Sequence, residues 1–524
     1  LYYVPVTGAR ITGDVFGGGS EANVNGNAPV NICTANYNYT GSAFQGVAIS
    51  RGSVYGGGSA GDELGNTNVT MAGGYVFDGV YGGGLHGNVG TFTRSHTITT
   101  ASNGIDHNNH TGCVEKPTAC TAGGTCTVVV TGGQIGPVEV VKDGGGMKNT
   151  NRYFIKEDDD TEPVDYGFVF GAGRGAVENP YVDLDADFHT YVNKTDVTIG
   201  GTAFIMASVY GGGENGRVLG DTHVTIQGNC QIGCGEGKID SNNKPVRYTD
   251  GQWSAAETAV KSGVAAAIDA AALAECPHWE YESPYYPHDP YGTGEHDAAL
   301  TGTDGHTYFG NVFGGGSGYF PYKKADGTHD WVRSAGWVEG NTVVDITGGH
   351  ILTNVYGGNE MTNVGRDDDA TTGKTTGKCT VNMSGGTIGV PRTLAQIAAH
   401  PVTCYLFGAG QGDQRTHFNT WTNVNSTDVN VTGGIIYGSV FGGGEDGHIL
   451  GNANVKVGGT AHIGTWGTSY VDGNVFGGGR GFSGLALTAG STGGNVDVTI
   501  SGGTMLGSIY GGGRLASVGT YFKA

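Results

Sequence analysis

The chain is poor in proline, in basic residues and in long apolar runs. Proline accounts for only 14 of 524 residues, and Lys and Arg number 27 against 48 Asp and Glu. The resulting net charge of -21 excludes the electrostatic footprint of a nucleic-acid-binding protein and disfavours binding to an anionic membrane surface. No apolar run approaches the roughly 18 residues of a membrane-spanning helix, so we expect no membrane insertion.

The chain opens at Leu1 with no signal peptide, which is expected both of a mature secreted protein and of an excised fragment. Its nine cysteines are an odd number, so at least one is unpaired within the chain or pairs elsewhere. Disulfides in loops of an exported protein and buried free thiols are both compatible with the spacing of Cys120, Cys126, Cys230 and Cys234. The two alternatives are evenly balanced for Cys379 and Cys404.

What the chain has in excess is glycine, at 102 residues, about a fifth of the total against an average of about 7%. A disordered glycine-rich chain would lack aromatic residues, which here make up 10%. The glycines recur in a motif of an aliphatic residue, Phe or Tyr, and three residues that are nearly all glycine. Its eleven copies begin at Val15, Val54, Val80, Val169, Val209, Val312, Val355, Leu406, Val440, Val475 and Ile509.

Two further motifs complete the repeat. Alternating apolar and small polar residues closed by Gly-Gly, as in 430–434, are typical of a strand followed by a corner. A third piece follows three of the triple glycines and begins at Leu64, Leu219 and Leu450. Three short strands per repeat favour an all-β parallel β-helix solenoid of about 11 or more coils. The alternative, a β-propeller, needs four antiparallel strands per blade, for which the best-preserved repeats have too little room.

Stacked coils place equivalent side chains in columns about 4.8 Å apart. We therefore expect the aromatic positions to form one column of rings, and Asn66, Asp221 and Asn452 to belong to a polar ladder at a corner. Residues 1–524 are interpreted as a single continuous solenoid. Insertions at two corners of the coil account for the longer spacings: 20–45, 85–125, 137–166, 174–195, 234–307, 317–340, 359–378, 390–403 and 411–427.

The insertion 234–307 is the richest in chemistry. Ser254 and Glu257 match a capping box, which predicts one short inserted helix over 255–274, ended by Pro277. The aromatic and acidic residues that follow suit glycan recognition, while packing of the insertion onto the rod is the competing structural role. The candidate glycan-binding residues are Trp279, Glu280, Tyr281, Tyr285, Tyr286, Asp289 and Tyr291, with Tyr319, Trp331 and Trp337 in the next insertion.

No catalytic pair emerges from this set, because nothing in the spacing of its carboxylates selects two of them. His107, His110 and Cys113 are candidate zinc ligands, against a disulfide-pinned loop with incidental histidines. The acidic runs 157–160 and 367–369 offer oxygen ligands for calcium but are typical of solvated loops. We therefore expect no cofactor, with zinc or calcium as the alternatives.

The succession of strand, Gly-Gly, strand and aromatic-Gly-Gly-Gly resembles the glycine-rich parallel β-helix repeats of large bacterial surface proteins. These include autotransporter passengers, filamentous adhesins and surface proteins of gut Bacteroidetes. The resemblance covers nearly the whole chain and implies a secreted or cell-surface location, but it transfers no catalytic residue. Pectate-lyase-like enzymes share the same coil, and their catalytic constellations are not recognisable here.

These observations predict an extracellular structural or adhesive surface protein, and they favour a non-enzymatic role over an enzymatic one. The repeat is under way by Gly8 and still running at Gly513, which leaves little room for caps. We therefore expect either a segment of a longer parent chain or a subunit that associates end to end into a fibre. The alternative is a carbohydrate-binding protein, or a polysaccharide lyase or glycoside hydrolase, with its site in the insertions of 234–340.

Overall fold

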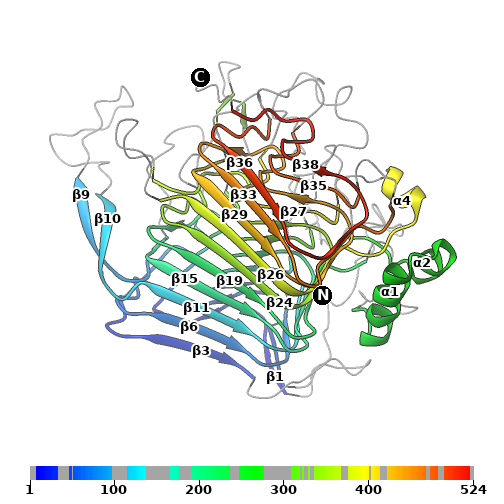
Figure 1. Ribbon diagram of the computed structural model, residues 1–524. Helices are drawn as coiled ribbons and strands as arrows, with labels where there is room; N and C mark the ends of the chain where they lie inside the picture. The colour runs from blue at the N-terminus through cyan, green and yellow to red at the C-terminus, as the bar shows by residue number, and fades with distance from the viewer. Residues whose placement is uncertain are drawn as a thin grey trace.

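The computed structural model is an all-β structure with large parallel sheets and a few peripheral helices (Figure 1). It describes residues 8–33, 46–49, 51–96, 115–136, 166–175, 190–235, 247–276, 309–318, 322–323, 329–330, 335–366, 376–399, 403–412, 422–467, 472–481 and 489–519. All strand pairs within the two largest sheets are parallel, unlike the antiparallel blades of a propeller.

A 19-stranded sheet contains the strands that precede and follow the Gly-Gly corner. Its longer strands are β3 (Ala28–Ile32), β6 (Thr67–Met71), β11 (Thr125–Val130), β15 (Lys194–Ile199), β19 (Thr222–Ile226), β24 (Thr342–Ile351), β26 (Lys378–Ile388), β29 (Ser426–Val431), β33 (Ala453–Val457) and β36 (Val496–Ile500). Its shorter strands are β1 (Ala9–Ile11), β4 (Val47–Ile49), β7 (Tyr75–Val76), β12 (Gln134–Ile135), β16 (Phe204–Ile205), β20 (Gln231–Ile232), β30 (Ile435–Ile436), β34 (His462–Ile463) and β37 (Thr504–Met505).

An 11-stranded sheet contains one strand from each copy of the triple-glycine motif. Its strands are β2 (Val15–Phe16), β5 (Val54–Tyr55), β8 (Gly79–Tyr81), β13 (Phe168–Phe170), β17 (Val209–Tyr210), β21 (Val312–Phe313), β25 (Val355–Tyr356), β27 (Leu406–Phe407), β31 (Val440–Phe441), β35 (Val475–Phe476) and β38 (Ile509–Tyr510). Successive copies of the repeat lie on one another. We call each copy a level, numbered 1 to 11 by its strand in this sheet.

A third column joins the levels after the triple glycine. It contains β14 (Tyr191–Val192) paired with β18 (Arg217–Val218), β28 (Asn423–Val424) paired with β32 (His448–Ile449), and single bridges such as Val338 to Val364. Two antiparallel hairpins lie outside the levels: β9 (Thr91–His96) with β10 (Glu115–Ala122), and β22 (Tyr322–Lys323) with β23 (His329–Asp330).

The main core is aliphatic and is enclosed by the sheets. In β6 the side chains of Val69 and Met71 are fully buried while Asn68 is exposed, as the alternation of the sequence predicts. The same positions in other levels carry Val, Ile or Met, and they form one continuous cluster with the Val or Leu that precedes the aromatic residue in levels 2 to 10. Each level therefore adds its aliphatic side chains to one shared core.

The triple glycines are required because neighbouring levels approach backbone to backbone. The Gly211 N–H donates to the Phe313 carbonyl at 3.0 Å, and that of Gly212 donates to the Gly315 carbonyl at 2.9 Å. A Cβ atom on Gly211 would lie 2.1 Å from the Gly314 carbonyl oxygen of the next level. At level 11, by contrast, a Cβ atom on Gly511 or Gly512 would meet nothing within 4 Å. The first glycine of each motif thus makes room for the level above it.

The aromatic residues form the expected column of rings, which lies on the outer face of the 11-stranded sheet. Ten successive contacts run unbroken from Phe16 to Tyr510, with ring centroids 4.6 to 5.2 Å apart. The rings belong to a second hydrophobic cluster that also includes Trp253, Phe309 and Tyr405. The stack therefore has an aliphatic core inside and an aromatic layer outside one sheet.

Tyrosines in this column bind carboxylates two levels further along the stack. The Tyr81 hydroxyl donates to Glu214 Oε2 at 2.7 Å, and Tyr210 and Tyr356 donate in the same way to Glu360 and Glu445 at 2.9 and 2.5 Å. Glu214 and Glu445 directly follow a triple glycine, and Glu360 follows the copy of the motif that ends in Asn359. Burial and the Glu445 carboxylate together raise the pKa of Tyr356 above its usual value, so its hydroxyl keeps the proton that it donates.

The expected polar ladder at the corner is confirmed. Asn66 Oδ1 accepts from the Thr125 N–H at 3.0 Å, Asp221 Oδ1 from the Asn341 N–H at 2.8 Å, and Asn452 Oδ1 from the Asn495 N–H at 2.8 Å. In each case a side chain of one level satisfies a backbone donor of the next. These side chains thereby replace backbone hydrogen bonds at the corner and keep neighbouring levels in register.

The prediction of one inserted helix over 255–274 is wrong in its start, its continuity and its number. The described residues contain three helices: α1 (Asp250–Ser262), α2 (Ala265–Ala271) and α4 (Leu394–Ala399). Thr249 and Gln252, rather than Ser254 and Glu257, form the capping box, so α1 begins earlier than expected. Gly263, with φ of 68°, then ends α1 in the left-handed conformation and separates it from α2.

Cys379 and Cys404 are buried free thiols, as are Cys126 and Cys230. Cys126 and Cys379 pair in register with Thr67 and Thr342, whose hydroxyls donate to glycine carbonyls at 2.6 and 2.5 Å. These two cysteines thus take a position that other levels fill with threonine. A cysteine fits this position because its side chain is also small and its thiol is a weak hydrogen-bond donor.

We predict that Gly211→Ala lowers the free energy of unfolding by about 3 kcal/mol, because its Cβ atom meets backbone that must shift. Gly511→Ala is the matched control at the same motif position and is expected to change stability by less than about 0.5 kcal/mol. Urea unfolding of both variants checks this. Equal destabilisation by the two substitutions would contradict the role given to the close approach between levels.

We also predict that His448 makes the fold sensitive to acid. Its Nδ1 atom accepts from the Ser491 N–H at 3.2 Å, and burial lowers its pKa to about 4. The fold holds this imidazole neutral. Its contribution to the free energy of unfolding is therefore complete above the unfolded pKa of about 6.5, and about 3 kcal/mol of stability is lost as the pH falls toward 4.

His448→Asn tests this, because Asn363 in the same column accepts from the Asn423 N–H at 2.7 Å without titrating. The variant should have the same melting temperature as the parent at pH 8. Between pH 7 and pH 4.5 its melting temperature should fall by less than that of the parent. Parallel losses in the two proteins would rule out His448 as the acid-sensitive group.

Candidate functional site

The candidate binding residues of the sequence fall almost wholly outside the described part of the chain. This holds for Trp279, Glu280, Tyr281, Tyr285, Tyr286, Asp289, Tyr291, Tyr319 and Trp331, and for His107, His110 and Cys113. Trp337 is described, and it packs against the stack. The Arg217 guanidinium lies 4.5 Å from the centre of its ring, and its Nε1–H donates to the Gly365 carbonyl at 2.9 Å.

Inserted segments that follow the Gly-Gly corner meet on one side of the stack, where α1, α2 and α4 lie (Figure 1). Helix α1 is fixed there by Trp253, which is buried and stacks on His350 of β24 with ring centroids 4.1 Å apart. The Tyr248 N–H donates to Gln231 Oε1 at 2.8 Å. Both contacts join the insertion to strands of the 19-stranded sheet, β24 and β20, so its first part is built into the fold.

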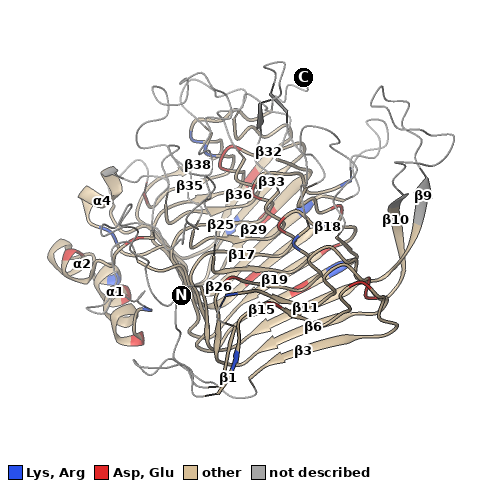
Figure 2. Cartoon of the chain, turned by 180° about the vertical axis from the view of Figure 1, so that it is seen from behind, with Lys and Arg blue, Asp and Glu red and all other residues tan. Residues whose placement is uncertain are grey.

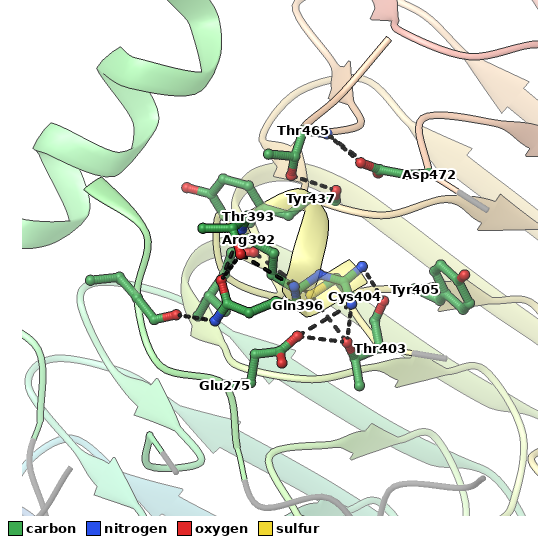
Figure 3. A network of polar contacts seen from close by, with 12 residues as sticks. Glu275, Arg392, Thr393, Gln396, Thr403, Cys404, Tyr405, Tyr437, Thr465 and Asp472 are labelled. Atoms are coloured by element: carbon green, nitrogen blue, oxygen red, sulfur yellow. Dashed lines mark hydrogen bonds and ion pairs between the residues drawn. The ribbon is translucent and has the colours of Figure 1, made fainter. Parts of the chain in front are cut away.

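Arg392 is the centre of a buried polar network at this place (Figure 3). Its Nη1 atom lies 3.2 Å from Glu275 Oε1 and donates to Thr403 Oγ1 at 2.6 Å. Glu275 belongs to the insertion 234–307, whereas Arg392 and Thr403 bound the insertion 390–403. The ion pair therefore links two insertions that are more than a hundred residues apart in sequence.

A third inserted segment, between Thr465 and Asp472, joins the same network (Figure 3). The Trp466 Nε1–H donates to the Arg392 carbonyl at 2.7 Å, and the Trp466 N–H donates to Asp472 Oδ2 at 3.0 Å. Burial raises the pKa of Asp472 to about 7, although Arg392 and the N–H groups of Trp466 and Thr465 favour the carboxylate. Three segments from different levels are thus held through one arginine.

Helix α4 is tied to α2 beside this network. Thr393 and Gln396 form a reciprocal cap, in which the Gln396 N–H donates to Thr393 Oγ1 at 3.2 Å and the Thr393 N–H donates to Gln396 Oε1 at 2.8 Å. The remaining Gln396 Nε2 donates to the Leu273 carbonyl at 3.4 Å. Leu273 follows α2, so the two insertions share backbone contacts as well as the ion pair.

Cys404 lies in the network with a backbone conformation that is rare outside glycine, at φ of 69°. Burial raises the pKa of its thiol, against the opposing effect of Arg392. A reactive cysteine needs a lowered pKa and access to solvent, whereas this side chain is fully buried. The network therefore holds the insertions in place, and its arrangement does not suit nucleophilic catalysis.

A second cluster of charged groups is half exposed and lies beside the tyrosines of levels 2 and 3. Arg174 Nε is 3.5 Å from Glu214 Oε2, with side chains 38% and 30% exposed. Asp78 accepts from the Ser53 hydroxyl, and burial raises the pKa of Asp78 to about 6. A carboxyl whose pKa is raised by burial thus lies beside a partly exposed Arg–Glu pair, an arrangement that is common at functional sites.

This cluster was not found in the sequence because its members come from different levels. The sequence did carry a signal for this cluster, namely a charged residue directly after the glycine-rich motif. Four copies of the motif are followed by such a residue: Arg174, Glu214, Glu360 and Glu445. The Glu214 carboxylate accepts from the Tyr81 hydroxyl, and the same pair recurs at Tyr210 and Tyr356. Its recurrence identifies the tyrosine–glutamate contact as a feature of the repeat, to which Asp78 and Arg174 are local additions.

Within the described ranges, no group of three or more His, Cys, Asp or Glu side chains is placed to hold a metal ion. Over the same residues, no helix has the length and apolar character needed to cross a membrane. Acidic and basic residues are spread over successive levels (Figure 2).

Comparison with known proteins returned no family model, no curated protein and no solved structure that matches the chain.

We predict that Arg392→Met lowers the free energy of unfolding by about 3 to 5 kcal/mol, because it leaves Glu275 buried without its partner. The double variant Arg392→Met/Glu275→Leu removes both charges and should recover most of that loss. Urea unfolding and limited proteolysis of α1 and α2 measure the effect. A single variant within about 1 kcal/mol of the parent would show that the ion pair does not anchor the insertions.

Proposed function

We propose that this chain is an extracellular structural or adhesive surface protein, secreted or displayed at a bacterial cell surface. We further propose that its parallel sheets wind as one continuous β-helix solenoid. The bacterial surface location rests on the resemblance of its glycine-rich repeat to those of large surface proteins. The solenoid is supported by strands that pair in parallel with their equivalents in the next level at every described level of the 11-stranded sheet.

The observation that carries the structural role is the number of independent contacts that fix one level on the next. Aliphatic packing, ring stacking, side-chain ladders and backbone pairing all repeat along the stack. A body in which every level is held in four ways is suited to resist bending and local unfolding. Such rigidity serves a rod that carries other segments outward.

The inserted segments are the proposed contact surface of this rod. Their bases are held by buried groups, as Glu275 and Arg392 show, so that the parts further out are presented from a fixed position. Glycans are one class of partner, given the aromatic and acidic residues at 279–291. Polysaccharide cleavage or sugar binding without adhesion is the competing function.

Replacement of residues 279–304 by a short Gly-Ser linker tests the proposal. We expect at least a tenfold loss of adhesion to glycan-coated or matrix-protein-coated surfaces, with an unchanged melting temperature, since Glu275 and Arg392 remain. A matched linker in place of 368–374 controls for loop shortening.

Adhesion that survives replacement of every inserted segment would overturn the role given to the insertions. Release of reducing ends or unsaturated sugars from a panel of polysaccharides would favour the enzymatic alternative.

A further inference from the structure

We infer that Glu63 is a proton-controlled latch. The segment 59–65 keeps the Glu63 carboxyl inside the stack while that group is protonated, and it swings outward when the carboxyl ionises. This latch depends only on the stacking of levels and not on the surface role proposed above. Glu63 lies after the triple glycine of level 2 in the third column, where single bridges join it to Val24 of level 1 and Val89 of level 3.

Every other level carries an uncharged residue at this position of the third column. Level 10 has Thr492, and nine levels have Val or Ile: Val24, Val89, Val192, Val218, Val338, Val364, Val424, Ile449 and Val518. Most of these aliphatic side chains belong to one buried hydrophobic cluster. Glu63 therefore places a carboxyl group where the levels before and after it place methyl groups.

The Glu63 carboxyl is buried without compensation. The residue is 0% exposed, and neither carboxyl oxygen has a hydrogen-bond partner. Burial raises the pKa of Glu63, and the Gly65 N–H opposes this only in part, because it completes no hydrogen bond to the carboxyl. An ionised carboxylate would lose its hydration here and gain nothing in return, so the closed stack favours the protonated acid.

Among the described residues, no charged side chain affects the pKa of Glu63. Thr67 and Cys126 are the first inward residues of β6 and β11, and the equivalent residue of β3 is an alanine. Thr67 Oγ1 donates to the Gly82 carbonyl at 2.6 Å, and burial raises the pKa of Cys126 to about 12, so both stay neutral. The neighbouring Asp62 is partly exposed, and its Oδ1 accepts from the Asn88 N–H at 2.9 Å.

The backbone around Glu63 is held by few contacts, so it can open without disrupting a strand. The Glu63 N–H donates to the Asn88 carbonyl at 2.8 Å, and the Glu63 carbonyl accepts from the Gly90 N–H at 2.7 Å. Levels 4 and 5 are joined in this column by the paired strands β14 and β18, whereas levels 1 to 3 are joined by single bridges. Outward rotation of 59–65 would hydrate the carboxylate while β6 keeps its place in the sheet.

The raised pKa fixes the sign of the pH effect. The closed segment has its full stability below the ordinary pKa of a glutamate, 4.5, and loses stability as the pH rises through the pKa of the closed state. Between these two pKa values the ratio of open to closed segment should rise about tenfold per pH unit. This dependence is opposite in sign to that of His448, which loses stability toward acid.

Hydrogen–deuterium exchange of the full chain, followed at 59–65 and corrected for the intrinsic pH dependence of exchange, measures the opening from pH 4 to pH 8. In the parent, protection should fall by at least about threefold over this range. Glu63→Gln cannot ionise, and Glu63→Val restores the residue of levels 1 and 3, so both variants should keep constant protection. Glu21→Gln removes an exposed carboxyl from the corresponding segment of level 1 and should behave like the parent.

Loss of protection with rising pH in the parent and in Glu21→Gln, but in neither Glu63 variant, would support the latch. Protection that does not change with pH in the parent, or that falls equally in Glu63→Gln, would overturn it. Glu63→Val is expected to fold, because valine already occupies this position in the adjoining levels. Its melting temperature at pH 8 should exceed that of the parent.

Discussion

The close approach of backbone to backbone between levels is the constraint on which the structure depends. Parallel strands about 4.8 Å apart leave no room for a Cβ atom where the chain bends out of the 11-stranded sheet, so the residue directly after the aromatic ring must be glycine. Once the bends coincide, each side chain lies over its equivalent in the next level. The aliphatic core, the ring column and the polar ladders are all consequences of that superposition.

The repeat made much of this predictable, because its features are local. Alternation within a strand predicts that Val69 is buried and Asn68 exposed, and recurrence of Asn and Asp before a strand predicts the corner ladder. The start of α1 was predicted wrongly because Ser254 and Glu257 match a capping box as well as Thr249 and Gln252 do. The packing of Trp253 on His350 holds the first turn of α1 in place, and that contact joins residues far apart in sequence.

Contacts between unlike side chains of different levels could not be predicted, because insertions of unequal length hide which residues lie near one another. Tyr81 and Glu214 are 133 residues apart, yet their contact is repeated by Tyr210 with Glu360 at a separation of 150. The relation becomes regular only when residues are counted in levels. The same reason hid the Arg392 network, whose members come from three separate insertions. Most residues proposed for glycan binding lie outside the described part of the chain, so they remain predictions.

A parallel stack also differs from most folds in having two unlike faces. In an antiparallel sheet a strand edge can pair with its own copy by a twofold axis, which closes the assembly at a dimer. Here the strands of the two largest sheets pair in parallel, so each level presents one face to the level before it and a different face to the level after it. A level therefore packs only against the matching face of its neighbour. The contacts that hold the levels together thus also fix their order along the stack.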